Sequence, residues 1–204
     1  MNPIFQELRQ KQFEELLQTD EYQTLLKDVT KDIIRESKQS NSESTTATIF
    51  EIELLTFIRD VTGSKFYPTK ELLVDTERHI TKGRIDARIG AVVIEYKHYG
   101  KLQYGNEKES ASVQLKEYLS GLYAKEGNNY FGIITDGVIA KTIEVKDGIY
   151  YEGEFADLSV RILDFLVRNI ASLSKKALTS KNLVDAFASN SDNSVSKSIP
   201  LDIQ

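Results

Sequence analysis

Residues 83–97 read GRIDARIGAVVIEYK, and this stretch decides the fold expected for the chain. Ile85, Ala87 and Ile89 alternate with charged side chains, which is the pattern of a strand with one buried face. Gly90 and Ala91 suit a two-residue type II′ turn, because glycine readily adopts the positive φ that the first turn position needs. The residues that follow are apolar until the charges of EYK, so the stretch predicts a hairpin whose second strand becomes charged only at its end.

The turn also fixes which residues of the two strands face each other. Counting outward from it pairs Ile89 with residue 92, and the same register sets Asp86 opposite Glu95. Their Cβ atoms would lie about 5 Å apart, and like charges in that position destabilise a strand pair. A divalent cation would remove this conflict, since Mg²⁺ is usually held by one or two carboxylates together with waters and a phosphate.

Lys97 is the third charged residue of this candidate site. It follows Glu95 by two residues, so both side chains project from the same face, about 7 Å apart along the strand. Its ammonium group could reach the same phosphate or an attacking water. The alternative is that Arg84, Asp86, Arg88 and Lys97 form a solvated ion-pair face without a chemical role.

The rest of the chain predicts helices before, between and after a set of strands. Helices are expected near the N-terminus, at 20–37, at 43–61 ended by Gly63, at 108–125 ended near Gly127, and at 158–173 with Asp157 as N-cap. Strands are expected at 71–76, 84–89, 92–97, 129–135 and 138–145, with Asp-Gly turns at 136–137 and 147–148. This order predicts an α/β fold in which a mixed β-sheet is flanked by helices and preceded by an N-terminal helical extension.

Composition narrows the classes of function. The chain has 204 residues, 40% of them hydrophobic, which predicts one main domain. It has no cysteine, so any metal must be held by oxygen or histidine ligands. The net charge is -5, but residues 1–60 hold 12 acids and 7 bases, while the segment from His79 to Lys101 holds five Lys or Arg and two acids. The hairpin therefore lies in a basic neighbourhood that suits a nucleic acid.

Two further features concern the location of the protein. No apolar run approaches the roughly 18 residues that a membrane-spanning helix needs. The N-terminal residues MNPIFQELRQ do not resemble a secretory leader. We therefore expect a cytoplasmic protein that does not contact a membrane.

The hairpin resembles the motif of the PD-(D/E)xK nuclease superfamily, with Asp86, Glu95 and Lys97 at the motif positions and Ile85 where many members have proline. In SVQLKEYLSGLY, Gln114 and Tyr118 are similar to the QxxxY signature of the RecB-like branch. The stretches YFGIITDGVIAKTIEV and LTSKNLVDAF resemble the N-terminal nuclease domain of type IIG restriction-modification enzymes and its lead into an adenine-N6 DNA methyltransferase. The likeness covers about residues 40–190.

This resemblance implies a restriction-endonuclease-like fold, with an N-terminal helical segment at 1–40, a nuclease core at 41–175 and a C-terminal helical connector at 176–204. It implies a metal-dependent deoxyribonuclease that hydrolyses phosphodiester bonds. Asp86, Glu95 and the Tyr96 carbonyl would hold Mg²⁺, for which Mn²⁺ could substitute. Lys97 would orient or help to deprotonate the attacking water, and Gln114 and Tyr118 would position the substrate or the active-site groups.

The resemblance also implies partners for the chain. These are double-stranded DNA, a methyltransferase or specificity domain in the same polypeptide, and a second copy in a transient dimer for double-strand cleavage. A non-catalytic DNA- or protein-binding module on the same fold is the alternative. A small-molecule phosphohydrolase is less favoured, because the sequence has no glycine-rich phosphate loop.

An upstream acid often joins the site in this superfamily, and Glu43, Glu51 and Glu53 are the candidates here. Glu43 projects near the centre line of the apolar stripe on the helix at 43–61, whereas Glu51 and Glu53 fall roughly 80° to either side. Glu43 is therefore the preferred residue and Glu51 the second choice. A first-turn acid favoured by the helix dipole is the alternative explanation for Glu43.

Overall fold

The computed structural model describes residues 14–62, 67–74 and 83–171 of the chain. Its elements, in chain order, are α2 (Asp20–Ser37), α3 (Glu43–Thr62), β1 (Thr69–Val74), β2 (Gly83–Ile89), β3 (Val92–Tyr96), η1 (Lys101–Gln103), α4 (Gly105–Glu126), β4 (Tyr130–Thr135), β5 (Ile139–Lys146), β6 (Ile149–Glu152), β7 (Ala156–Asp157) and α5 (Val160–Ala171). Within these ranges, the structure confirms the expected helices at 20–37, 43–61 and 108–125 and all five expected strands, with small shifts at their ends.

The strands form one seven-stranded mixed sheet in the order β1-β2-β3-β4-β5-β6, with β7 also paired to β5. β3 and β4 are parallel, and the other paired strands are antiparallel. α4 makes the crossover between the two parallel strands. The expected α/β fold, with a mixed sheet flanked by helices and an N-terminal helical part, is confirmed.

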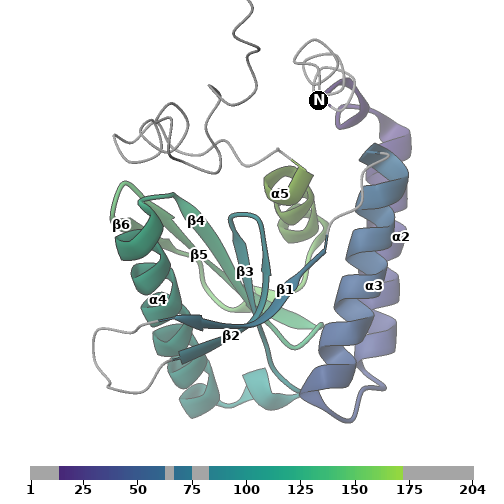
Figure 1. The fold of residues 1–204 in the computed structure, drawn as a ribbon. Coiled ribbons are helices and arrows are strands. Elements are labelled where there is room, and N and C mark those ends of the chain that lie inside the picture. The colour runs from purple at the N-terminus through teal and green to yellow at the C-terminus, as the bar shows by residue number, and fades with distance from the viewer. Residues whose placement is uncertain (1–13, 63–66, 75–82, 172–204) are drawn as a thin grey trace, which may run out of the picture.

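The helices cover the sheet on both faces (Figure 1). α2, α3 and α5 pack on one face in a core with Tyr22, Phe50 and Ile94 among its buried members, and α4 packs on the other face over residues such as Val93 and Ile134. A Cβ at Gly132 of β4 would lie 2.8 Å from a side-chain carbon of Leu115, so the absence of a side chain there lets α4 approach the sheet closely. β3 and β4, buried along their whole length, form the centre of the sheet.

The hairpin has the expected turn and register next to that turn. Gly90 has φ +60°, as the first position of a type II′ turn requires. The pairs are Ile89 with Val92, Arg88 with Val93 and Ala87 with Ile94. The β2–β3 ladder ends at the pair Ala87–Ile94. The prediction that Asp86 lies directly opposite Glu95 in this ladder is therefore wrong.

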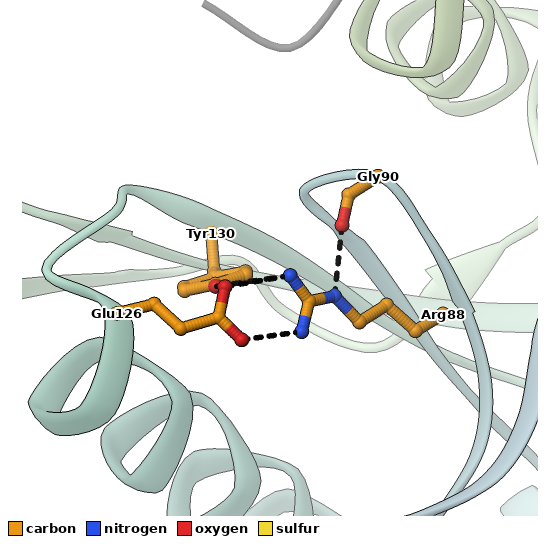
Figure 2. A network of polar contacts seen from close by, with 4 residues as sticks. All are labelled: Arg88, Gly90, Glu126 and Tyr130. Carbon is orange, nitrogen blue, oxygen red and sulfur yellow. Dashed lines mark hydrogen bonds and ion pairs between the residues drawn. The ribbon is translucent and has the colours of Figure 1, made fainter. Parts of the chain in front are cut away.

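A network of polar contacts ties the turn end of this hairpin to the end of α4 (Figure 2). The Arg88 guanidinium donates two hydrogen bonds to the Glu126 carboxylate, at 2.7 and 2.8 Å, and one to the Gly90 carbonyl at 2.9 Å. It also lies over the Tyr130 ring, whose hydroxyl donates to Glu126 at 2.5 Å. Arg88 lowers the pKa of Glu126 to about 2. Arg88 is therefore a structural residue, and not part of a solvated charged face.

Two details differ from the expectation. β6 and β7 were not expected, because they are short and solvent-exposed and lack the apolar alternation that marks a buried strand. α5 begins at Val160, and Asp157 does not cap it because it lies in β7, paired with Ile139. The Ser159 hydroxyl instead accepts a bond from the Ile162 amide at 3.4 Å.

Some expectations concern residues outside the described part of the chain. They are Gly63 as a helix end, most of the helix near the N-terminus, the end of the helix at 158–173 and the C-terminal connector at 176–204. Within the described residues, no helix combines the length and the apolar character needed to cross a membrane.

Candidate active site

The candidate site lies where the parallel strands β3 and β4 end. Tyr96 is the last residue of β3 and pairs with Thr135, the last residue of β4. The Lys97 amide then donates to the Thr135 carbonyl at 2.8 Å, so the first residue beyond β3 is still held by the sheet. The first turn of α3 lies at the same end of the sheet (Figure 1). The carboxyl ends of parallel strands are where open α/β folds place their ligands.

Asp86 reaches this end of the sheet through the point where β2 and β3 separate. Its Oδ2 accepts a hydrogen bond from the Tyr96 amide at 2.9 Å. If the ladder had continued, a backbone carbonyl of β2 would have accepted the bond from this amide instead. Burial raises the pKa of Asp86, and the bond from the Tyr96 amide opposes that rise. Asp86 therefore lies near Glu95 because its side chain binds the amide of the next residue, Tyr96, and not because the two acids pair across the strands.

Glu95 and Lys97 form an ion pair on the α4 side of the sheet. Glu95 pairs in register with Ile134, which belongs to the core under α4. The Lys97 Nζ donates to the Glu95 Oε1 at 2.5 Å, and their side chains are 15% and 1% exposed. The Glu95 Oε2 is buried and has no hydrogen-bond partner among the described residues. A buried carboxylate oxygen normally has a partner, so this one is open to a further ligand.

The electrostatics of the site link Glu95 to its neighbours. Burial, followed by the negative charge of Asp86, raises the pKa of Glu95 to about 7, although Lys97 acts in the opposite direction. Burial alone would lower the pKa of Lys97, but the charges of Glu95, Glu43 and Asp86 raise it above its ordinary value. Lys97 is therefore protonated at neutral pH.

Glu43, the preferred upstream acid, interacts electrostatically with Lys97 and Asp86. It is the first residue of α3 and is largely exposed, yet partial desolvation raises its pKa, with Lys97 lowering it and Asp86 raising it. Glu43 thus lies near enough to Asp86 and Lys97 for their charges to shift its pKa.

Glu51, the second choice, has different surroundings. It is buried in α3 and forms an ion pair with Lys70 of β1. Lys70 also lies 5.8 Å from the centre of the Tyr96 ring. Burial, followed by the charge of Glu51, raises the pKa of the Tyr96 hydroxyl, although this hydroxyl forms no hydrogen bond of normal geometry in the described structure. Since its charge is matched by Lys70, Glu51 is less suited than Glu43 to bind a cation.

Gln114 and Tyr118 lie on α4, which covers the sheet face from which Glu95 projects. The Gln114 side-chain amide donates to the Tyr118 hydroxyl at 2.7 Å, and the Tyr118 ring is buried in the core beneath α4. Among the described residues, no hydrogen bond joins Gln114 to Asp86, Glu95 or Lys97. The pair is therefore on the expected face, and the Gln114 amide is bonded to Tyr118.

Asp136 also lies in this region, although the sequence marks it only as part of an Asp-Gly turn. It is 1% exposed, and its Oδ2 accepts a bond from the Gly100 amide at 3.1 Å. Its Oδ1 accepts bonds from the Val138 and Ile139 amides at 3.0 and 2.7 Å. The signal that could have revealed it is its place directly after the mostly apolar strand β4, the same position that Lys97 has after β3.

The oxygen atoms at the end of β3 suit a hard cation. The amide and carbonyl of one residue in an extended strand point to the same side. Because the Tyr96 amide binds Asp86, the Tyr96 carbonyl is directed toward Asp86 as well. In the part of the chain that the structure describes, no three His, Asp or Glu side chains converge on one point. Two carboxylates and a carbonyl, with the unpartnered Glu95 Oε2 among them, fit a Mg²⁺ ion that completes its coordination with water and phosphate.

Comparison of the chain with protein-family models, with curated proteins and with solved structures gives no match.

Proposed function

We propose that the chain is a Mg²⁺-dependent DNA endonuclease domain that hydrolyses phosphodiester bonds. One observation carries the proposal, the state of the Glu95 carboxylate. One of its oxygens is neutralised by Lys97, the other is buried without a partner, and Asp86 reaches the same strand end. A buried acid in this state is unfavourable for stability, so a role in ligand binding explains its presence better than a structural role.

The roles of the residues follow from their positions. Asp86, Glu95 and the Tyr96 carbonyl would hold the cation. When bound, Mg²⁺ would polarise the scissile phosphate and favour a hydroxide nucleophile. Lys97 stays protonated, so it would stabilise developing phosphate charge and orient the attacking water through its N–H groups.

Three other residues have supporting roles in this proposal. Glu43 would supply a further carboxylate toward the cation or its waters. Gln114 and Tyr118, hydrogen-bonded to each other on α4, would position the substrate backbone. These roles would put the substrate between the first turn of α3 and the middle of α4.

The proposal includes the setting of the domain. The substrate is double-stranded DNA, and the domain would be the cleavage part of a cytoplasmic restriction-modification enzyme. A methyltransferase or specificity domain in the same polypeptide would supply sequence recognition, and a transient dimer would cut both strands. The basic stretch around the hairpin supports contact with DNA.

Plasmid cleavage in Mg²⁺ tests the activity. Lys97→Ala should lower the cleavage rate about 100-fold, which is the usual effect of losing one positioned charge donor. Lys116→Ala is the matched control, because Lys116 of α4 forms an ion pair with Glu152 of β6 instead of with the candidate site, and this variant should keep the wild-type rate. Equal rates for wild type and Lys97→Ala would refute the assignment of Lys97.

Metal binding tests the site independently of cleavage. Mg²⁺ or Mn²⁺ at about 100 times its dissociation constant should stabilise the wild-type fold by about 2.7 kcal/mol and should not stabilise Glu95→Gln. The binding-module alternative predicts a different result. If neither metal stabilises the protein, and Asp86→Ala raises stability by relieving charge repulsion, the site is not a metal centre.

A further inference from the structure

Asp136 connects two loops at the candidate site. It follows β4 directly and is almost completely buried. Its Oδ2 binds the amide of Gly100, which lies 36 residues earlier in the loop after β3. Its Oδ1 binds two amides of its own turn, those of Val138 and Ile139. Each carboxylate oxygen therefore accepts bonds from a different loop: Oδ2 from the loop after β3, and Oδ1 from the turn after β4.

The segment Lys97–Gly100 is held at two points, and the contact between Asp136 and Gly100 is the second of them. The first is the bond from the Lys97 amide to the Thr135 carbonyl at 2.8 Å. Successive residues at the end of β4 therefore fix the first and the last residue of this four-residue segment. Gly100 has φ +84°, which allows the sharp change of direction into η1.

The turn that carries Asp136 is itself held on its other side. A Cβ placed on Gly137 would lie 2.0 Å from the Ser37 Oγ at the end of α2. The Thr135 hydroxyl accepts a bond from the Gly137 amide at 2.9 Å. The turn therefore has little room to move, and a bond from it to Gly100 transmits that rigidity to the loop after β3.

We propose that Asp136 is a positioning residue, which holds the segment Lys97–Gly100 so that the Lys97 ammonium stays against Glu95. The contact that holds the segment does not depend on the proposed function, and only its effect on DNA cleavage rests on that function. Asp136 does not touch the reacting atoms in this scheme and acts through Lys97.

Asp136→Asn separates the two roles of the carboxylate, which are to hold its own turn and to bind the Gly100 amide. The asparagine oxygen can still accept bonds from Val138 and Ile139, so the turn is kept. Its NH₂ group then faces the Gly100 amide, and two donors cannot bond to each other. The variant should stay folded while losing the hold on the loop.

Hydrogen exchange measured by NMR on the full chain tests the proposal without relying on activity. In Asp136→Asn, the Gly100 amide and the Lys97 ammonium should both exchange at least about 10-fold faster than in the wild type. Asp147→Asn is the matched control, because it makes the same chemical change in the other Asp-Gly turn, at an exposed residue between β5 and β6. If the exchange of both groups in Asp136→Asn equals that of the wild type, the proposal is overturned.

A double-mutant cycle on DNA cleavage then separates positioning from a general structural effect. Asp136→Asn should lower kcat about 10-fold or more, since small misplacements of a reacting group have effects of this size, with KM for DNA unchanged. In the Lys97→Ala background it should cause no further loss. An equal loss in both backgrounds would overturn the proposal. If the wild type cuts no DNA while the NMR difference is present, the proposed function fails and the positioning role of Asp136 stands.

Discussion

Replacing Glu95 by glutamine tests the electrostatics of the candidate site with almost no change in volume. In the wild type, burial and then the charge of Asp86 raise the pKa of Glu95 from 4.5 to about 7. A folded-state pKa above the unfolded-state value means that the folded protein binds this proton more tightly. The stabilisation that results is complete below pH 4.5 and is lost as the pH rises through about 7.

The size of the effect follows from these values. A rise from 4.5 to about 7 corresponds to about 3 kcal/mol, at about 1.4 kcal/mol for each pH unit. Through Glu95 alone, the wild type should lose about 3 kcal/mol of unfolding free energy between about pH 4.5 and pH 8. Glutamine does not ionise, so Glu95→Gln should lack this loss. Lys97 stays charged throughout this range because its pKa is raised, and it adds no pH dependence of its own.

The assay is urea unfolding followed by circular dichroism at several pH values, in EDTA so that no divalent cation binds. The difference in unfolding free energy between Glu95→Gln and the wild type should shift in favour of the variant as the pH rises. Glu152→Gln is the control, because Lys116 lowers the pKa of Glu152, which keeps the residue ionised over the same range. Parallel pH curves for the wild type and Glu95→Gln would refute the reasoning.

Two further predictions concern the turn at Gly137 and the choice of upstream acid. Gly137→Ala should destabilise the fold by about 2–5 kcal/mol, from its φ of +81° and the clash with Ser37. Gly148→Ala, at φ +78° and with only ordinary van der Waals contacts to the Tyr123 ring, should cost about 1–2 kcal/mol. Equal losses in chemical denaturation would contradict the close packing at Gly137. Glu43→Gln should lower DNA cleavage about 10-fold and Glu51→Gln less than about twofold, and the reverse order in the plasmid assay would favour Glu51.

The sequence was sufficient to predict the hairpin register near its turn. Gly90 marks the turn and the alternation at Ala87 and Ile89 marks one buried face, and both are local signals. The prediction that Ile85 shares this face is wrong, because Ile85 packs in the core under α4. The point at which β2 and β3 separate was not predictable, because a period of two residues says nothing about where a ladder ends. The structure shows that Asp86 uses its side chain to bind the Tyr96 amide at that point.

The role of Asp136 needed the three-dimensional arrangement. Its neighbours Val138 and Ile139 are local, so an Asp-Gly turn was predictable from the sequence. Its bond to Gly100 depends on β3 and β4 ending side by side, which is a consequence of the parallel crossover through α4. The difference between Glu43 and Glu51 has a similar origin, because a helical projection cannot show that Lys70 of β1 pairs with Glu51.

The Arg88–Glu126 contact of Figure 2 has a consequence for the order of folding. It joins residues 38 apart in the chain, whereas the bond between the Tyr22 hydroxyl and Asp164 joins residues 142 apart. Closing a shorter loop costs less entropy, and contacts between nearby segments form faster. The hairpin, α4 and β4 can therefore assemble as one early unit that already contains Asp86, Glu95 and Lys97. Glu43 joins them only when the N-terminal helices dock, so the cluster of charges is completed late in folding.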